Sequence, residues 1–141
     1  MTASVLDSWA MIGWLQDEEP ARAKVHELLE QASRGKTRLS IPLINAGEVF
    51  YLIAKRHGAA PAERFLADLA MMPIQPLLPN RRLILGAARL KSRYPISYAE
   101  AFAVETAREQ NAILVTGDPE LWHLSKPEPI ELLWVGKRQA H

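Results

Sequence analysis

The stretch from Ser97 to Asp118 limits most strongly what this chain can fold into. Ser97 is a residue type that caps helices, and the run 98–110 contains no glycine or proline and carries apolar residues at helical spacing. Asn111 ends this predicted helix, and the short branched run 112–115 is typical of a parallel strand buried on both faces. Asp118 then follows the carboxyl end of that strand, which is where ligands bind in open α/β sheets.

The rest of the chain alternates between the same two patterns. Strands are predicted at 4–6, 39–41, 112–115 and 129–135, with a further edge-like segment at 73–77 that contains two prolines. Helices are predicted after Asp7, over 20–34, 42–57, 61–71, 80–91 and 98–110, and in a short turn after Asp118. This alternation predicts an α/β fold with a mainly parallel sheet and helices on both faces. The last residues, 136–141, are predicted to be a basic, frayed end.

Composition narrows the function classes. The 141 residues are 48% hydrophobic and 23% charged, which indicates one globular domain over residues 1–141 with a substantial core. The formal charge of +1 is too balanced for nucleic-acid binding by global charge, so any such contact has to be local. No cysteine is present, and no apolar run approaches the roughly 20 residues that span a bilayer. We therefore expect a cytoplasmic protein without a membrane segment.

Four acids are candidates for chemistry, although three of them have ordinary explanations. Asp7 and Asp118 each follow a predicted strand, and both are suitable helix N-caps. Glu100 stands three residues after Ser97, and this spacing is that of a capping box, which is a purely structural device.

The fourth acid, Glu48, is harder to explain by local structure. It lies inside a predicted helix beside Ile44 and Tyr51, and Asn45 is the only polar neighbour one turn away. An acid on a mostly apolar face is costly without a partner or a metal. Taken together, the four acids can reach one edge of the sheet, and their mutual repulsion favours a bound cation. Oxygen ligands favour Mg²⁺ or Mn²⁺, whereas the lack of cysteine argues against zinc.

The acids lie in segments that resemble a known family. The segments are Val5-Leu6-Asp7-Ser8, Asn45-Ala46-Gly47-Glu48, 96–102 with Glu100, and Leu114-Val115-Thr116-Gly117-Asp118-Pro119-Glu120. In this order and spacing they resemble PIN-domain proteins of the VapC type, the toxins of toxin–antitoxin pairs. The resemblance implies a three-layer sandwich with a central parallel five-stranded sheet. It also implies a Mg²⁺- or Mn²⁺-dependent endoribonuclease site, a homodimer and a small antitoxin partner.

The resemblance assigns the metal and the catalysis to Asp7, Glu48, Glu100 and Asp118. At Glu100 the family most often has aspartate, so this chain differs there by one methylene. Ser8 and Thr116 are expected to position water or to brace a carboxylate. A local basic group is a candidate contact for RNA phosphates, and a solvated helix face explains it equally well; its members are Arg81, Arg82, Arg89, Lys91 and Arg93.

Two other functions remain open from the sequence. One is a PIN-fold protein that binds RNA or an antitoxin without cleaving, which is favoured if Glu100 disables the metal site. The other is a phosphatase or a DNA nuclease on the same scaffold. Asp7 after a strand suits an aspartyl-phosphate phosphatase, but Trp9 stands where such enzymes carry a second aspartate.

Overall fold

The computed structural model describes residues 2–137, so most of the predicted basic end, residues 138–141, lies outside the described residues. The strands are β1 (Thr2–Leu6), β2 (Thr37–Pro42), β3 (Gln75–Leu77), β4 (Ile113–Thr116) and β5 (Leu132–Trp134). The helices are α1 (Ser8–Leu15), α2 (Ala21–Ser33), α3 (Leu43–His57), α4 (Ala59–Ala70), α5 (Arg81–Arg93), α6 (Tyr98–Glu109) and α7 (Pro119–Leu124). Within residues 2–137, no helix combines the length and the apolarity needed to cross a membrane.

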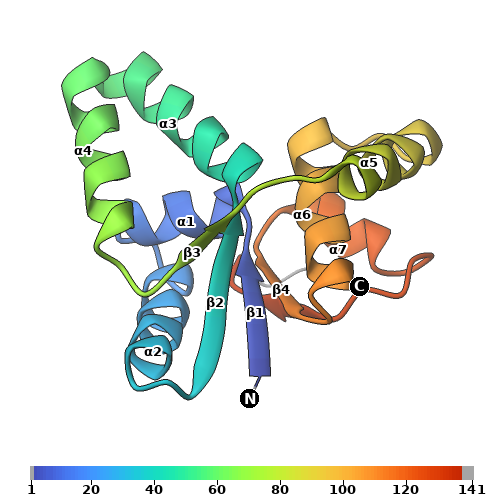
Figure 1. Cartoon of the computed structure of the whole chain (residues 1–141), viewed down its shortest axis with the longest axis horizontal. Coiled ribbons are helices and arrows are strands. Elements are labelled where there is room, and N and C mark those ends of the chain that lie inside the picture. Colours follow the sequence, from blue (N-terminus) through green and yellow to red (C-terminus); the bar gives the residue numbers. More distant parts are fainter. Residues whose placement is uncertain (1, 138–141) are drawn as a thin grey trace.

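The five strands form one parallel sheet in the order β3-β2-β1-β4-β5 (Figure 1). The predicted fold class, a central parallel five-stranded sheet flanked by helices, is therefore confirmed. β3 is an edge strand, as the prolines at 73 and 76 predict, since proline cannot donate a ladder hydrogen bond.

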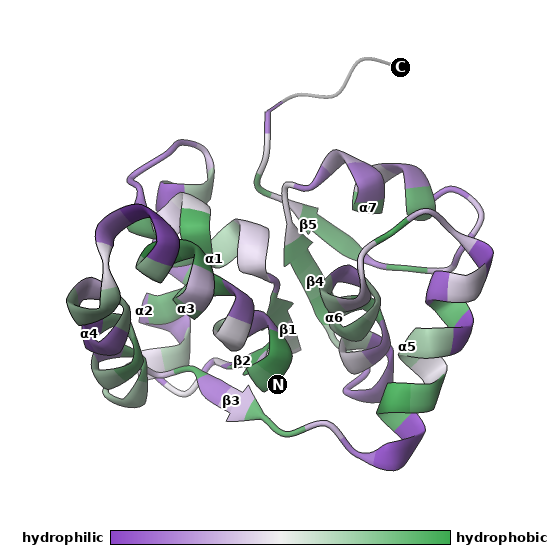
Figure 2. Ribbon diagram, turned by 90° about the horizontal axis from the view of Figure 1, so that it is seen from above, coloured by the Kyte–Doolittle hydropathy of each residue, from purple (hydrophilic) through white to green (hydrophobic). Residues whose placement is uncertain are grey.

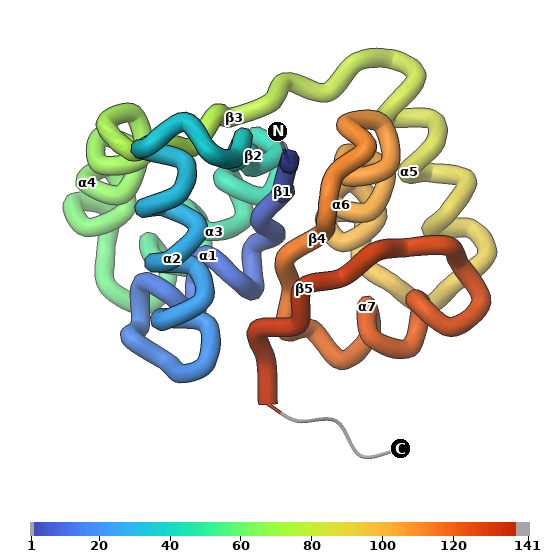
Figure 3. Tube along the Cα trace, turned by 90° about the horizontal axis from the view of Figure 1, so that it is seen from below, coloured from blue at the N-terminus to red at the C-terminus, as the bar shows by residue number. Residues whose placement is uncertain are grey.

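Helices cover both faces of the sheet, and each face has its own core. Helices α1 to α4 lie on one side of the strands and α5 to α7 on the other, as Figures 2 and 3 show from opposite directions. Val5 and Leu6 are adjacent in β1 and both fully buried, yet they belong to different cores, because successive side chains of a strand point to opposite faces. Leu114 and Val115 divide in the same way in β4. This double burial explains why the strands read as continuous apolar runs.

Local signals set most of the element boundaries. Ser97 caps α6 and forms the predicted capping box with Glu100, and Asn80 caps α5 through a hydrogen bond from the Leu83 amide. Several boundaries differ by one to three residues: β5, for example, covers only Leu132–Trp134 of the predicted 129–135, and α4 begins at Ala59 rather than at residue 61. Gly58, with φ of 95°, turns the chain directly from α3 into α4 and leaves no room for a longer loop.

The topology places a switch point, where the strand order reverses, between β1 and β4. From β1 the chain builds the sheet in one direction through β2 and β3, and it then returns to add β4 and β5 on the other side of β1. The strand order therefore reverses between β1 and β4, and ligands bind at the carboxyl ends of strands beside such a point. The residues that follow β1 and β4 include Asp7 and Asp118.

Candidate active site

Asp7 is the most deeply buried acid at this edge, with 3% of its surface exposed. It caps α1, since its Oδ1 accepts a hydrogen bond from the Ala10 amide at 2.8 Å. Its Oδ2 accepts a hydrogen bond from the Thr116 hydroxyl. Burial raises the pKa of Asp7 to about 7, because the desolvation of the charged form outweighs these two hydrogen bonds. The carboxyl of Asp7 therefore holds a proton readily near neutral pH.

Asp118 is only half-buried and caps α7 by accepting the Glu120 amide at 2.9 Å. Burial, together with the charge of Glu100, raises its pKa to about 6. Its own amide donates to the Thr116 hydroxyl oxygen at 3.1 Å. Thr116 thus touches Asp7 with its proton and Asp118 through its oxygen, and it fixes the two acids relative to each other across the switch point.

The turn that carries Asp118 is held by a close approach of an aromatic ring. A Cβ atom at Gly117 would lie 2.3 Å from the ring of Trp9 on α1, so only glycine fits at that position. Because the ring lies against the backbone of residue 117, α1 supports the turn between β4 and α7. The glycine of the Thr116-Gly117-Asp118 segment is therefore explained by packing beside the candidate site.

Glu100 uses its two carboxylate oxygens differently. Oε1 accepts a hydrogen bond from the Ser97 amide at 2.9 Å and completes the capping box. Oε2 is buried and receives no hydrogen bond. Burial first, and then repulsion from Glu120, raises the pKa of Glu100. The capping role and a ligand role are therefore compatible, because each needs a different oxygen.

Three carboxylates converge at the N-termini of α6 and α7. One oxygen from each of Glu100, Asp118 and Glu120 lies within 4.8 Å of the other two. The charges of Glu100 and Asp118 also help to raise the pKa of Asp7, so Asp7 belongs to the same electrostatic cluster. The ion pairs of the described residues involve other acids: Asp17, Glu19, Glu30, Glu105 and Glu128. Oxygen ligands at this spacing, one of them buried without a donor, fit a hard divalent cation.

Glu48 stands apart from this convergence. It is half-buried on α3, and its Oε2 accepts a hydrogen bond from the Tyr51 hydroxyl at 3.3 Å. Its apolar neighbours Ile44 and Tyr51 are 38% and 46% exposed, so the helix face around Glu48 is partly open to water. The partial burial of Glu48 therefore does not by itself require a metal, and its assignment to the site stays a prediction.

Asn45 connects the helices that carry the acids, and no role was predicted for it from the sequence. Its Nδ2 donates to the Ser8 hydroxyl at 3.1 Å and to the Ala99 carbonyl at 3.3 Å, while Ser8 donates back to the Asn45 carbonyl at 3.2 Å. Asn45 therefore joins α1, α3 and the start of α6, next to Asp7 and Glu100. Ser8, expected to brace a carboxylate or water, contacts Asn45 instead, because its hydroxyl faces α3.

Glu120 is the other residue of the site that was not predicted from the sequence. The available signal was its place two residues after Asp118, with Pro119 at the first helical position. That arrangement puts both acids in one turn at the same edge of the sheet.

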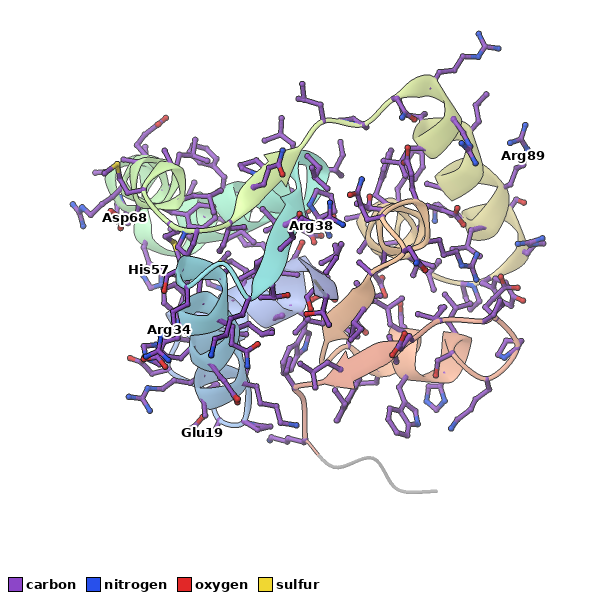
Figure 4. The ribbon with its side chains drawn as sticks, turned by 60° about the horizontal axis from the view of Figure 1, so that its bottom comes forward. Glu19, Arg34, Arg38, His57, Asp68 and Arg89 are labelled. Atoms are coloured by element: carbon purple, nitrogen blue, oxygen red, sulfur yellow. The ribbon has the colours of Figure 1, made fainter. Side chains whose placement is uncertain are left out.

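Most of the basic group on α5 lies away from the acids; Lys91 is the exception, since it bonds to the carbonyl of the peptide unit whose amide Glu100 accepts. α5 packs on the outer side of α6, and Figure 4 shows Arg89 on α5 at the outside of the molecule. Lys91 donates to the Ile96 carbonyl at 2.8 Å, and Arg93 lies 3.7 Å from Glu128. Arg81 and Arg82 are exposed in the first turn of the helix. Two of the five cations thus have structural partners, which favours a solvated helix face.

Comparison with known proteins identifies the family. The PIN domain family model matches residues 4–127, so this chain belongs to the PIN-domain family. No curated protein matches the sequence.

Solved structures show the same fold at low sequence identity. The chain is similar to VapBC2 from Rickettsia felis bound to a promoter DNA fragment, with a TM-score of 0.73, 14% identity, and 95% of this chain and 99% of that chain covered. It is also similar to DNA-bound VapBC from Salmonella typhimurium, with a TM-score of 0.72, 13% identity, and coverage of 94% and 98%. A third is VapC20 from Mycobacterium tuberculosis, described as a sarcin-ricin loop cleaving toxin, with a TM-score of 0.68, 13% identity, and coverage of 86% and 94%.

Proposed function

We propose that this protein is a divalent-metal-dependent endoribonuclease and the toxin of a toxin–antitoxin pair. The observation that supports this most strongly is the convergence of Glu100, Asp118 and Glu120 within 4.8 Å, beside buried Asp7, at the switch point of a PIN-family sheet. VapC20 of M. tuberculosis, which shares the fold, is described as cleaving the sarcin-ricin loop, and RNA is therefore the substrate class we propose. The cytoplasm, where such RNA is found, is the location that we propose for this protein.

In this proposal Asp7, Glu100 and Asp118 hold Mg²⁺ or Mn²⁺, with Glu48 as the fourth acid after its side chain turns from Tyr51. When bound, the cation supplies Lewis acidity toward water and toward the charge that develops on the phosphate. Thr116 fixes the position of Asp7 relative to Asp118 by hydrogen bonds to both residues, and Asn45 holds α3 against α1 and α6. The free Oε2 of Glu100 leaves the site able to bind a cation, which argues against the alternative of a binding protein that cannot cleave.

Cleavage of RNA by the purified protein tests the proposal directly. We expect a labelled RNA to be cut internally in the presence of Mn²⁺ or Mg²⁺ and to remain intact with EDTA. A single-stranded DNA of the same sequence is the control that separates a ribonuclease from a DNA nuclease. Tight RNA binding without any cut in either metal would instead support the non-cleaving alternative.

The buried acids should make two quantities depend on pH in opposite directions: the stability of the metal-free protein and the stabilisation that a bound metal adds. Folding raises the pKa of Asp7 from 3.8 to about 7 and that of Asp118 to about 6, so the folded state binds protons more tightly than the unfolded state. This contribution to stability is complete below about pH 4 and is lost as the pH rises through 6 and 7. The Tm of the metal-free protein should therefore fall between about pH 5 and pH 8.

A cation bound by these carboxylates replaces the protons, and its stabilisation grows with the fraction of ionised ligand. Millimolar Mg²⁺ should thus raise the Tm at the higher pH much more than at the lower pH. Differential scanning fluorimetry with and without EDTA measures both values. Equal shifts at the two pH values would contradict the assignment of the metal to these acids.

We propose that the antitoxin binds at a cavity formed by α1, α3 and α4. It has a volume of about 280 Å³ and is lined by apolar side chains, including Ile12, Leu15 and Phe65, and by the charged residues Arg56, Arg64 and Asp68. An amphipathic helix with acidic residues beside its apolar face suits such a surface. An arginine of the same partner is expected to approach the carboxylates, which a guanidinium binds bidentately.

Co-expression with the small protein encoded beside this one should yield a stable complex in which cleavage is suppressed. Leu15→Glu, which places a charge in the cavity, should weaken that complex without lowering the activity of the free nuclease. Co-purification of the partner with undiminished cleavage would remove it as an antitoxin.

We also propose a homodimer through the exposed apolar residues at the start of α3 and on α5. These are Leu43, Ile44, Ile84 and Leu85, which are between 38% and 41% exposed. Light scattering that gives twice the chain mass of 15.8 kDa would support the dimer, and a single chain mass would exclude it.

A further inference from the structure

A cavity of about 270 Å³ adjoins the acid cluster on the side of α7. It lies between the loop before α6 and the helix α7. Its walls are mostly apolar, with two rings among them; the residues that matter here are Tyr94, Pro95, Ile96, Glu120, His123 and Leu124. Pro95 and His123 are exposed, so the cavity is open to solvent.

Glu120 belongs to both the cavity and the acid cluster. It lines the cavity, and its carboxylate is one of the three that lie within 4.8 Å of one another. A phosphate held at the acids through a divalent cation would therefore have its own nucleoside next to the cavity. Apart from Glu120, the residues that line the cavity do not belong to the acid cluster, and nothing in the proposed cleavage step accounts for them.

The volume and lining of the cavity suit one flat ring system. Its volume lies just below the roughly 300 Å³ at which small-molecule pockets begin, which leaves room for a base but not for a helix. Proteins recognise unpaired RNA bases by stacking them on rings such as Tyr and His and by hydrogen bonds to their polar edges. Tyr94 and His123 supply the rings, and Glu120 supplies an acceptor at the edge of the cavity.

The wall formed by Tyr94 is held in place before any ligand arrives. The Tyr94 hydroxyl donates to Oε2 of Glu128 at 2.7 Å, and Oε1 of Glu128 accepts from Arg108 at 2.8 Å. Arg108 in turn pairs with Glu105 at 3.1 Å on the same helix. This network ties the loop before α6 to the segment after α7, so a base would enter a preformed slot at little ordering cost.

We propose that this cavity binds the base of a nucleotide next to the scissile phosphate, and that Tyr94 and His123 are its base-contacting residues. The inference rests on the proposed ribonuclease function, because a phosphate can be held at these carboxylates only through a bound cation. Binding of the base would make cleavage depend on the nucleotide at that position.

Nuclear magnetic resonance of the histidine rings tests this without using activity. The full chain is titrated in millimolar Mg²⁺ with adenosine or uridine 5′-monophosphate, and in parallel with ribose 5-phosphate, which lacks the base. We expect the His123 ring signals, assigned by their loss in His123→Ala, to move with the nucleotides only. Isothermal titration calorimetry of the same mixtures gives the affinities, and the tighter nucleotide should bind at least about tenfold more tightly than ribose 5-phosphate.

Variants separate the cavity from the rest of the protein. In His123→Ala and in Tyr94→Leu, the affinities for the tighter nucleotide and for ribose 5-phosphate should lie within about twofold of each other, because base stacking is lost. Tyr94→Phe keeps the ring and should keep the preference. His26→Ala, an exposed histidine on α2, is the matched control and should behave as wild type.

The two proposals fail in different ways. If wild type cleaves RNA and binds ribose 5-phosphate as tightly as both nucleotides, the cavity does not bind a base and the ribonuclease proposal stands. If wild type neither cleaves nor binds a phosphate, adenosine and uridine without phosphate decide the question. Movement of the His123 signals by a nucleoside then supports the cavity alone, and no movement overturns both proposals.

Discussion

Replacing Asp7 by asparagine should lower metal-dependent RNA cleavage by at least about a hundredfold, or about 2.7 kcal/mol of barrier, while stabilising the metal-free protein above neutral pH. Loss of activity follows in this proposal because a cation site at the switch point loses the charge of its most buried acid. The gain in stability follows from that same burial. An ionised carboxylate with 3% exposure is costly to bury, and an amide of the same shape carries no charge.

The local structure around Asp7 should tolerate the amide. Its oxygen can still accept the Ala10 amide and cap α1, since asparagine is as good an N-cap as aspartate. Its nitrogen can donate to the oxygen of the Thr116 hydroxyl. In wild type that hydroxyl donates to Asp7 and accepts the Asp118 amide. Moving one pKa from 3.8 to about 7 corresponds to on the order of 4 kcal/mol, which is an upper limit for the stability gained.

Cleavage rates and urea unfolding in EDTA at about pH 5 and pH 8 measure both effects. The variant should lose most of the pH dependence that wild type shows. Asp17→Asn is the matched control: Asp17 is exposed on a turn, 3.5 Å from Arg22, and should change neither quantity appreciably. An Asp7→Asn protein that cleaves at the wild-type rate would remove Asp7 from the mechanism, and one that unfolds more easily above neutral pH would contradict its burial as a charged group.

The fold was predictable because its signals are local. A short apolar run followed by Asp-Ser or by Asp-Pro marks where β1 and β4 give way to helices, and the caps that form there are side chains bonding to backbone only two or three residues away. Once the parallel order is known, the carboxyl ends meet at one edge, and the meeting of Asp7, Glu100 and Asp118 follows from topology.

Side-chain direction was less predictable, because it depends on partners distant in sequence. Glu48 was assigned to the cluster from its position on α3, but its carboxylate bonds to Tyr51, a choice between rotamers that spacing does not encode. Arg93 was grouped with the cations of α5, yet Glu128, 35 residues later, engages it. Asn45 shows the converse: its polarity on an apolar face was visible, but its partners on α1 and α6 became visible only in the fold.

Glu100→Gln should lower cleavage by at least about tenfold, or on the order of 1.4 kcal/mol, without loss of folding stability. The side-chain oxygen of glutamine can accept the Ser97 amide, so the capping box survives. The other terminal atom becomes an amide nitrogen, which donates toward the Asp118 carboxylate instead of facing it as a second negative charge. The metal-free variant should therefore be at least as stable as wild type, and millimolar Mg²⁺ should raise its Tm much less.

Glu100→Asp tests the two roles of the Glu100 carboxylate separately, because aspartate is one methylene shorter. It keeps the charge but cannot reach the Ser97 amide and the other carboxylates at once. If its carboxylate stays with Asp118 and Glu120, the capping bond is lost, stability falls by about 1 kcal/mol, and cleavage stays near wild type. If it stays with the cap instead, stability is kept and cleavage falls as in Glu100→Gln.

Glu109→Gln is the matched control, on the same helix but exposed at its far end, where its Oε1 accepts a hydrogen bond from Asn80 that glutamine can keep. It should leave cleavage and the Mg²⁺-induced shift of Tm unchanged.

In Glu100→Asp we expect the metal to draw the aspartate side chain toward Asp118, since a bound cation attracts the charge more strongly than one backbone amide does. Wild-type cleavage by Glu100→Gln, together with an unchanged Mg²⁺ shift, would make Glu100 a helix cap alone and leave the metal to the remaining acids.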